Sequence, residues 1–285
     1  MFALHDVARH VLLQRPKELR VGRGRDSRKR RVKAGRWPLA PAMGSAGRAT
    51  MNSEAVGHYG RLMAETLLES LLQTAKKDGW AVGQFAPFHE SWPVAASLDG
   101  QAGALGLTAV PNRRGDAPVQ ELQPTTLDTA HPASLSAQVG LGEQPLHTDG
   151  AHLRRPPDYV ILWCTEPSAT PTRLWRPPIA RLLTSPDQNG VFLVRSGSDT
   201  WLATALSGAD LRFDPGCMTP ADASARRLSE ALQAPPEGDV QEVVWDMPGM
   251  VLLIRNRRVL HGRAAVVEGD LDRRLSRVAY REGTP

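Results

Sequence analysis

The sequence predicts a mainly β protein with flanking helices, built as a sandwich or jelly roll. From residue 144 onward, short runs rich in β-branched and aromatic residues follow one another, and one helical stretch at about 220–233 interrupts them. This order lacks the regular alternation of strands and helices that builds parallel sheets. The predicted strands lie at 158–164, 191–194, 200–204, 241–245 and 250–254. With 285 residues and no internal repeat, the chain has room for one sizeable domain.

The part of the chain before residue 144 gives weaker patterns. Residues 53–77 carry apolar side chains near helical spacing behind Ser53, a plausible N-cap. Gly79 would end this helix, and a short strand is expected at 80–82. Residues 85–143 are rich in Pro, Gly and polar side chains, so we expect loops there, with short strands near 105–110 and 119–122.

Charge is distributed unevenly along the chain. The chain has 35 basic and 30 acidic residues. Residues 1–50 hold 13 of the basic and 3 of the acidic residues, so the remainder holds 22 basic and 27 acidic residues. The first fifty residues therefore read as a disordered basic leader, because such a segment buries too little apolar surface to fold. A nucleic-acid arm, an organellar presequence and a translation start at Met51 are the alternatives. Residues 51–285 form the predicted domain, which is mildly acidic.

The two cysteines and the hydropathy pattern bear on the compartment. Cys164 and Cys217 are too few for a disulfide framework and form no Cys-x-x-Cys pair, so we expect buried thiols in a reducing compartment. No run of about 18 apolar residues exists, so no membrane span is expected. We therefore expect a cytoplasmic protein without a membrane partner.

The sequence His147-Thr148-Asp149 opens the β-rich part of the chain. On an extended strand residues i and i+2 point to the same face, so His147 and Asp149 would project an imidazole and a carboxylate into the same space. A second imidazole from a distant strand would complete the two-histidine, one-carboxylate set of non-haem Fe(II) oxygenases, which leaves positions open for cosubstrate and dioxygen. The candidate is His261. His152 is expected beside the site or in solvent.

Three motifs follow one another in order: His147-Thr-Asp149-Gly-Ala, Asn256-Arg-Arg-Val-Leu-His261-Gly-Arg263 and Arg273-Arg-Leu-Ser-Arg277. Together they resemble the Fe(II)/2-oxoglutarate dioxygenases of the taurine dioxygenase and clavaminate synthase group, over about 79–280. The resemblance implies a double-stranded β-helix (jelly roll, cupin-like) with iron bound by His147, Asp149 and His261.

The resemblance also implies roles for three further residues. Arg273 matches the arginine that pairs with the far carboxylate of 2-oxoglutarate, with Arg274 as the alternative if a bulge exchanges the two. Thr172 matches the threonine that hydrogen-bonds the same carboxylate, although Ala169-Thr-Pro-Thr172 stands where relatives have Gly-Gly-Asp-Thr. Arg277 matches a position that faces the substrate and would bind an anionic group of it.

The activity implied is that of a 2-oxoglutarate-dependent hydroxylase using Fe(II) and O2. It would oxidise an unactivated C–H bond of a small, carboxylate-bearing substrate, such as an amino acid or natural-product intermediate, and release succinate and CO2. Desaturation and ring closure stay open, as does the oligomeric state. Two other hypotheses are a catalytically idle jelly roll that binds metal or ligand, and a basic-tailed oxygenase associated with nucleic acid. The acidic body argues against the last, so we expect no nucleic-acid partner.

Overall fold

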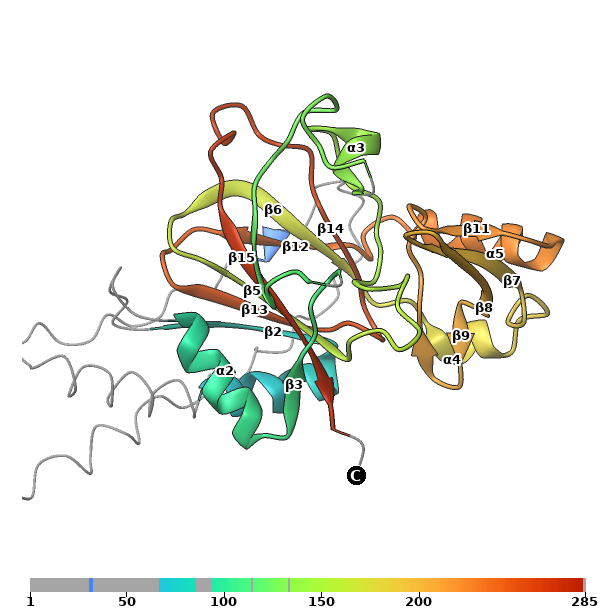
Figure 1. Cartoon of the computed structure of the whole chain (residues 1–285), viewed down its shortest axis with the longest axis horizontal. Coiled ribbons are helices and arrows are strands. Elements are labelled where there is room, and N and C mark those ends of the chain that lie inside the picture. Colours follow the sequence, from blue (N-terminus) through green and yellow to red (C-terminus); the bar gives the residue numbers. More distant parts are fainter. Residues whose placement is uncertain (1–30, 33–66, 86–93, 114, 133, 284–285) are drawn as a thin grey trace, which may run out of the picture.

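The computed structural model describes residues 31–32, 67–85, 94–113, 115–132 and 134–283. Its centre is a six-stranded sheet in the order β2-β13-β5-β15-β3, with β4 pairing alongside β15 (Figure 1). All of these pairings are antiparallel. The strands are β2 (Trp80–Gln84), β3 (Leu107–Ala109), β4 (Val119–Leu122), β5 (Tyr159–Cys164), β13 (Met250–Arg255) and β15 (Leu275–Glu282).

A second sheet, in the order β1-β12-β6-β14, packs against the first. Its strands are β1 (Arg31–Val32), β6 (Ser168–Trp175), β12 (Gln241–Trp245) and β14 (Leu260–Arg263). The apolar layer between the sheets includes Leu162 of β5, Leu252 of β13, Leu174 of β6 and Trp245 of β12, which are all almost fully buried. Two facing, mainly antiparallel sheets around a shared apolar layer make the predicted sandwich.

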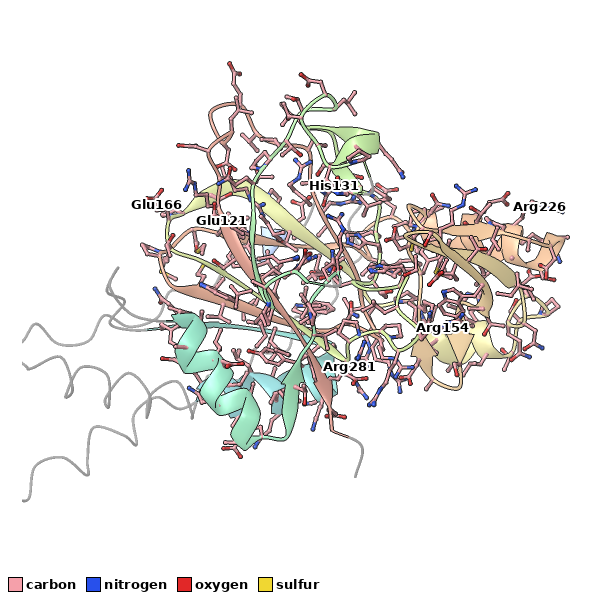
Figure 2. The ribbon with its side chains drawn as sticks, viewed as in Figure 1. Glu121, His131, Arg154, Glu166, Arg226 and Arg281 are labelled. Carbon is pink, nitrogen blue, oxygen red and sulfur yellow. The ribbon has the colours of Figure 1, made fainter. Side chains whose placement is uncertain are left out.

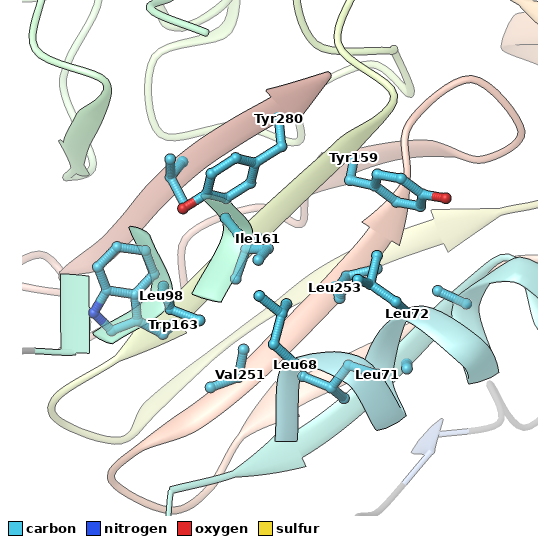
Figure 3. Packing of buried hydrophobic residues seen from close by; sticks show 14 of the residues in the cluster. Leu68, Leu71, Leu72, Leu98, Tyr159, Ile161, Trp163, Val251, Leu253 and Tyr280 are labelled. Atoms are coloured by element: carbon cyan, nitrogen blue, oxygen red, sulfur yellow. The ribbon is translucent and has the colours of Figure 1, made fainter. Parts of the chain in front are cut away.

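Strand β5 is buried on both faces, which explains its uninterrupted apolar sequence. Val160 and Leu162 point toward the second sheet. Ile161 and Trp163 point to the opposite side, where helical residues 67–78 and α2 (Val94–Ala104) cover the large sheet (Figure 3). A strand covered on both sides is held rigidly, and the loop that leads into β5 carries part of the site described below.

A separate lobe lies between β6 and β12 in the sequence. In Figure 1 it extends to one side of the sandwich. It contains a three-stranded sheet in the order β11-β7-β8 and a β9–β10 pair. Its elements are α4 (Ile179–Leu183), β7 (Val191–Ser196), β8 (Asp199–Thr204), β9 (Leu206–Ser207), β10 (Asp210–Leu211), β11 (Met218–Pro220) and α5 (Ala223–Gln233). Charged residues such as Arg226 and Glu166 lie on the outside of the molecule (Figure 2).

The strands predicted from residue 144 onward, and those at 80–82, 105–110 and 119–122, are confirmed to within a few residues. The helix predicted at 220–233 is α5, whose N-cap Asp222 accepts a hydrogen bond from Ala225 N. Helical residues 67–78 confirm the second half of the helix predicted at 53–77, and residues 53–66 lie outside the described part. Gly79 ends this helix with φ 99°.

Within 85–143 we expected loops and two short strands, and that expectation missed two helices, α2 and α3 (Ser136–Val139). Val94, Leu98 and Ala102 are buried along one face of α2 at a spacing of four, but Ala and Gly between them obscure the pattern. Within residues 1–50 the structure describes only Arg31–Val32, which pair in parallel with Glu242–Val243 of β12. Whether the rest of this segment is disordered stays a prediction.

Candidate metal centre

His147, Asp149 and His261 converge at one end of the sandwich. Their ligand atoms all lie within 4.8 Å of one another. The Nε2 atoms of His147 and His261 lie 3.6 Å and 3.7 Å from Asp149 Oδ1. The three side chains are almost entirely buried. The prediction that His147 and Asp149 share a face is met, since Thr148 points away and its hydroxyl donates to Phe213 O at 3.3 Å.

Backbone pairing brings the two histidines together across 114 positions of sequence. His147 N donates to His261 O at 2.9 Å, and His261 N donates to His147 O at 2.8 Å. Gly262 permits this approach, because a Cβ there would lie 2.9 Å from Gln144 O and 3.0 Å from Pro145 O. The glycine of the His261-Gly262-Arg263 motif therefore has a steric role in joining the two ligand segments.

The two imidazoles differ in their surroundings. His147 Nδ1 lies 2.9 Å from Pro145 O, so Nδ1 carries the proton and donates it there, which leaves the Nε2 lone pair for a metal. Burial opposes protonation of His147, but Asp149 and Asp214 outweigh it and raise its pKa. Burial dominates at His261 and lowers its pKa. Burial also disfavours the Asp149 anion, yet Arg277 and the two histidines hold the pKa of this carboxyl well below its usual range.

This donor set fits a divalent iron ion. Two imidazole nitrogens and one ionised carboxylate oxygen, grouped on one side, form the facial triad that non-haem iron oxygenases use. Among the described residues it is the one group of three or more His, Cys, Asp or Glu side chains close enough to share an ion.

Asn256 holds the backbone of Asp149, a function that sequence reasoning missed. Its Oδ1 accepts from Asp149 N at 2.8 Å, and its Nδ2 donates to Asp149 O at 3.0 Å and to Pro157 O at 2.8 Å. Asn256 is fully buried. It belongs to the same motif as His261, but nothing in the motif indicated which backbone it would contact. Asn256, directly after β13, thus fixes the backbone of Asp149, and the next strand, β14, carries the candidate ligand His261.

Arg277, on β15, lies beside the carboxylate of Asp149. Its Nη1 is 3.0 Å from both carboxylate oxygens. Its Nη2 donates to the side-chain oxygen of Gln120, whose Nε2 in turn donates to Asp116 Oδ2 at 2.9 Å. Arg277 therefore faces the site as expected, and in this structure it stabilises a candidate metal ligand directly.

Arg273 is buried, whereas the competing Arg274 has a side chain 63% exposed and lies 3.7 Å from Glu121. Arg273 Nε donates to Ser168 Oγ at 3.0 Å. Burial, reinforced by the like charge of Arg263, lowers the pKa of Arg273 to about 10, so the guanidinium stays charged at neutral pH. Of the two arginines, Arg273 is the one inside the sandwich.

Thr172 is also buried, on the strand that pairs with β14. It lies opposite Arg263, two positions along β6 from Leu174, the partner of His261. Its hydroxyl oxygen accepts a hydrogen bond from Trp245 Nε1 at 3.1 Å. Arg273 reaches β6 at Ser168 rather than at Thr172. The role implied for Thr172 therefore stays a prediction.

A small cavity adjoins Asp149 and Arg277. Polar side chains of Asn112 and Gln120 and apolar side chains contribute to its lining; the apolar residues include Val110, Pro111, Pro118, Leu153, Pro157 and Ala279. Gly150 also lines the cavity, with φ 65°, and a Cβ there would lie 2.7 Å from Pro157 Cδ. His152 lies nearby and its Nε2 is 2.9 Å from Asn112 O. Of the remaining histidines, His131 lies in a loop and His89 lies outside the described residues.

The fold recurs in solved structures of non-haem iron oxygenases. Asparagine oxygenase, solved with Fe(II), 2S,3S-3-hydroxyasparagine and succinate, is 19% identical with a TM-score of 0.61, over 80% of this chain and 83% of that one. The chain has the fold of these oxygenases. The non-heme iron oxygenase OrfP, solved with Fe and alpha-ketoglutaric acid, is 20% identical with a TM-score of 0.54, over 79% and 83% of the two chains.

A third structure of this oxygenase fold is PvcB, an Fe, alpha-ketoglutarate dependent oxygenase from an isonitrile synthetic pathway. It is 18% identical with a TM-score of 0.51, over 75% of this chain and 79% of that one. No protein-family model and no curated protein sequence matches the chain. The predicted jelly roll is thus confirmed by structural likeness. Within the described residues, no helix is both long and apolar enough to cross a membrane.

Proposed function

We propose that this protein is an Fe(II)- and 2-oxoglutarate-dependent oxygenase that hydroxylates, or otherwise oxidises, an unactivated C–H bond of a small carboxylate-bearing substrate. The observation that carries the proposal is the convergence of His147, Asp149 and His261 within 4.8 Å, in the fold of oxygenases solved with iron and alpha-ketoglutarate. His147 and His261 would bind Fe(II) through Nε2 and Asp149 through Oδ1. When bound, Fe(II), 2-oxoglutarate and O2 supply the oxidant and yield succinate and CO2.

The chain's own residues orient the reactants and keep water away. Arg273 would bind the far carboxylate of 2-oxoglutarate, since a planar guanidinium forms two parallel charge-assisted hydrogen bonds with a carboxylate. Its burial beside a second buried cation, Arg263, supports this function, because a bound carboxylate would stabilise the buried positive charge. Thr172 is the proposed second donor: its oxygen accepts from Trp245, so its proton is available to a carboxylate.

The groups that line the cavity beside Asp149 favour a substrate with one anionic end. Arg277 and Gln120 provide polar groups on one side, and proline and aliphatic side chains line much of the rest. Arg277 has five N–H donors and would bind a substrate carboxylate while still contacting Asp149. The asparagine oxygenase and OrfP structures hold hydroxyasparagine and hydroxyarginine, which favours an amino acid here.

The first experiment is an anaerobic titration of the purified protein with Fe(II) and 2-oxoglutarate, followed by the weak visible charge-transfer band of the chelate. We expect the band in the wild type and none in His147→Ala. Absence of the band from a folded, iron-loaded wild type would refute the proposal. Succinate formation with pooled amino acids then separates an active oxygenase from an idle metal-binding jelly roll, which would form none. A substrate affinity that is unchanged in Arg277→Ala would refute the role given to Arg277.

A further inference from the structure

We propose that Asp270 and Ser168 are positioning residues that orient Arg273 for the far carboxylate of 2-oxoglutarate. The inference rests on the proposed function and extends it to two residues that no sequence motif marks. Asp270 lies in the loop between β14 and β15, and Ser168 is the first residue of β6.

A chain of short contacts connects the three side chains. Arg273 Nε donates to Ser168 Oγ at 3.0 Å, and Ser168 Oγ donates to Asp270 Oδ2 at 2.8 Å. The same Asp270 oxygen accepts from Thr170 N at 2.9 Å. The one hydroxyl proton of Ser168 is donated in the hydrogen bond to Asp270, so the serine oxygen acts only as the acceptor toward Arg273. The direction of each hydrogen bond in the chain is therefore fixed.

Backbone hydrogen bonds also hold the loop that carries Asp270 and Arg273. Val267 N donates to Thr170 Oγ1 at 3.1 Å, and Arg273 N donates to Asp270 O at 3.3 Å. Hydrogen bonds to the first three residues of β6 thus hold both the backbone of the loop and the side chain of Arg273 in place. Thr172, the proposed second donor to the carboxylate, lies on the same strand two residues after Thr170.

The positive charges of Arg273 and Arg263 explain why Arg273 has a carboxylate partner, Asp270. Arg273 is 6% exposed and Arg263, another buried cation, opposes its charge. Asp270 is 9% exposed and its carboxylate favours the charged form of Arg273. Burial works against the Asp270 anion, yet hydrogen bonds from Thr170 and Ser168, together with the charge of Arg273, keep its pKa below the ordinary value. Asp270 thus stays ionised and offsets the repulsion between the two arginines.

The position of Ser168 determines which part of Arg273 remains for a ligand. A guanidinium binds a carboxylate either through Nε and one Nη or through both Nη groups. Ser168 occupies Nε, and among the described residues no protein acceptor bonds to either Nη group. The pair of Nη groups is therefore the edge presented to 2-oxoglutarate, and losing Ser168 or Asp270 would free the side chain to rotate.

The test compares two 2-oxoacids on the Mn(II)-loaded protein without oxygen, by calorimetry. 2-Oxoglutarate and 2-oxobutanoate share the keto-acid end, but only the first has a carboxylate for Arg273. For Ser168→Ala and Asp270→Asn we expect about a ten- to hundredfold loss of 2-oxoglutarate affinity. We expect the affinities of both variants for Mn(II) and 2-oxobutanoate to stay within about twofold of wild type. The variant Ser168→Thr keeps the hydroxyl, so its 2-oxoglutarate affinity should stay near that of the wild type.

Ser229→Ala is the matched control, because Ser229 is similarly buried but lies on α5 in the separate lobe. It should leave all three affinities unchanged. Unchanged 2-oxoglutarate affinity in Ser168→Ala would overturn the inference, and so would an equal loss for both 2-oxoacids, which indicates general damage. If the wild type itself fails to prefer 2-oxoglutarate over 2-oxobutanoate, the proposed cosubstrate is wrong and the inference falls with it. Ser168→Ala decides the question if Asp270→Asn does not fold.

Discussion

Replacing Asn256 by alanine tests how the structure holds Asp149 in place. The side-chain amide of Asn256 makes three hydrogen bonds, all to backbone groups of the loop that runs from Asp149 to Pro157. The alanine variant leaves those three groups buried without a partner and opens a cavity between the loop and the end of β13. The carboxylate of Asp149 would then lose its fixed position relative to His147 and His261.

The expected loss of stability follows from the number of hydrogen bonds that Asn256→Ala removes. Each buried backbone group left without a partner costs about 1–3 kcal/mol, and water entering the cavity would offset part of this, so we expect a loss of about 3–5 kcal/mol in the free energy of unfolding. Residues that orient metal ligands typically affect metal affinity by about ten- to a hundredfold, and we expect a weakening of that order for Co(II).

The assay combines urea denaturation of the metal-free protein with a titration of the visible Co(II) bands. Asn256→Asp keeps the shape of the side chain, but it replaces the two hydrogen bonds donated to Asp149 O and Pro157 O by repulsion between oxygen atoms. It should therefore lower the Co(II) affinity at least as much as Asn256→Ala. Gln101→Leu is the control: Gln101 is a buried amide on α2 whose polar atoms bond to nothing within the described residues. Its Co(II) affinity should equal the wild type's. Wild-type Co(II) binding in both Asn256 variants would refute the reasoning.

Three further predictions concern other parts of the site. Gly262→Ala should weaken Co(II) binding about tenfold or more, because its Cβ would push His261 away from the Gln144–Pro145 backbone; unchanged affinity would show that the strand shifts freely. Arg273→Ala should reduce 2-oxoglutarate affinity by about two orders of magnitude, whereas Arg274→Ala, at an exposed position, should leave it unchanged; the reverse result in calorimetry would assign the role to Arg274. Because the pKa of Asp270 is lower in the folded protein than its ordinary value of 3.8, its stabilising effect is complete above that value and is lost as the pH falls through the folded pKa. Urea denaturation should therefore show wild-type stability falling more steeply below about pH 4 than that of Asp270→Asn, and parallel curves would contradict the assignment.

Sequence reasoning found the strands because each strand has a local pattern. The apolar run 158–164 is continuous because β5 is covered on both faces, and such a run is readable without any structure. It missed α2, whose buried positions are four apart but separated by small residues with little contrast in polarity. A helix is recognised in a sequence by the contrast between apolar buried residues and polar exposed ones, and this contrast is weak where the exposed residues are mostly Ala and Gly.

The three proposed iron ligands were also identified from sequence, for a different reason. His147 and Asp149 are two residues apart, so strand geometry alone puts them on one face. His261 was selected through its motif, and the structure brings it to the other two ligands through the pairing of β14 with the residue 147 backbone. The choice between Arg273 and Arg274 could not be made from sequence, because it depends on which side chain lies inside the sandwich.

The sequence by itself determined the class of fold, the positions of most strands and the chemistry of the proposed ligands, because these follow from local periodicity and residue type. Only the tertiary structure decided which groups support those ligands. Asn256 contacts a backbone 107 positions away, and Asp270 reaches a serine 102 positions away. Such contacts depend on how separate strands register in three dimensions, and no local pattern of side chains encodes that register.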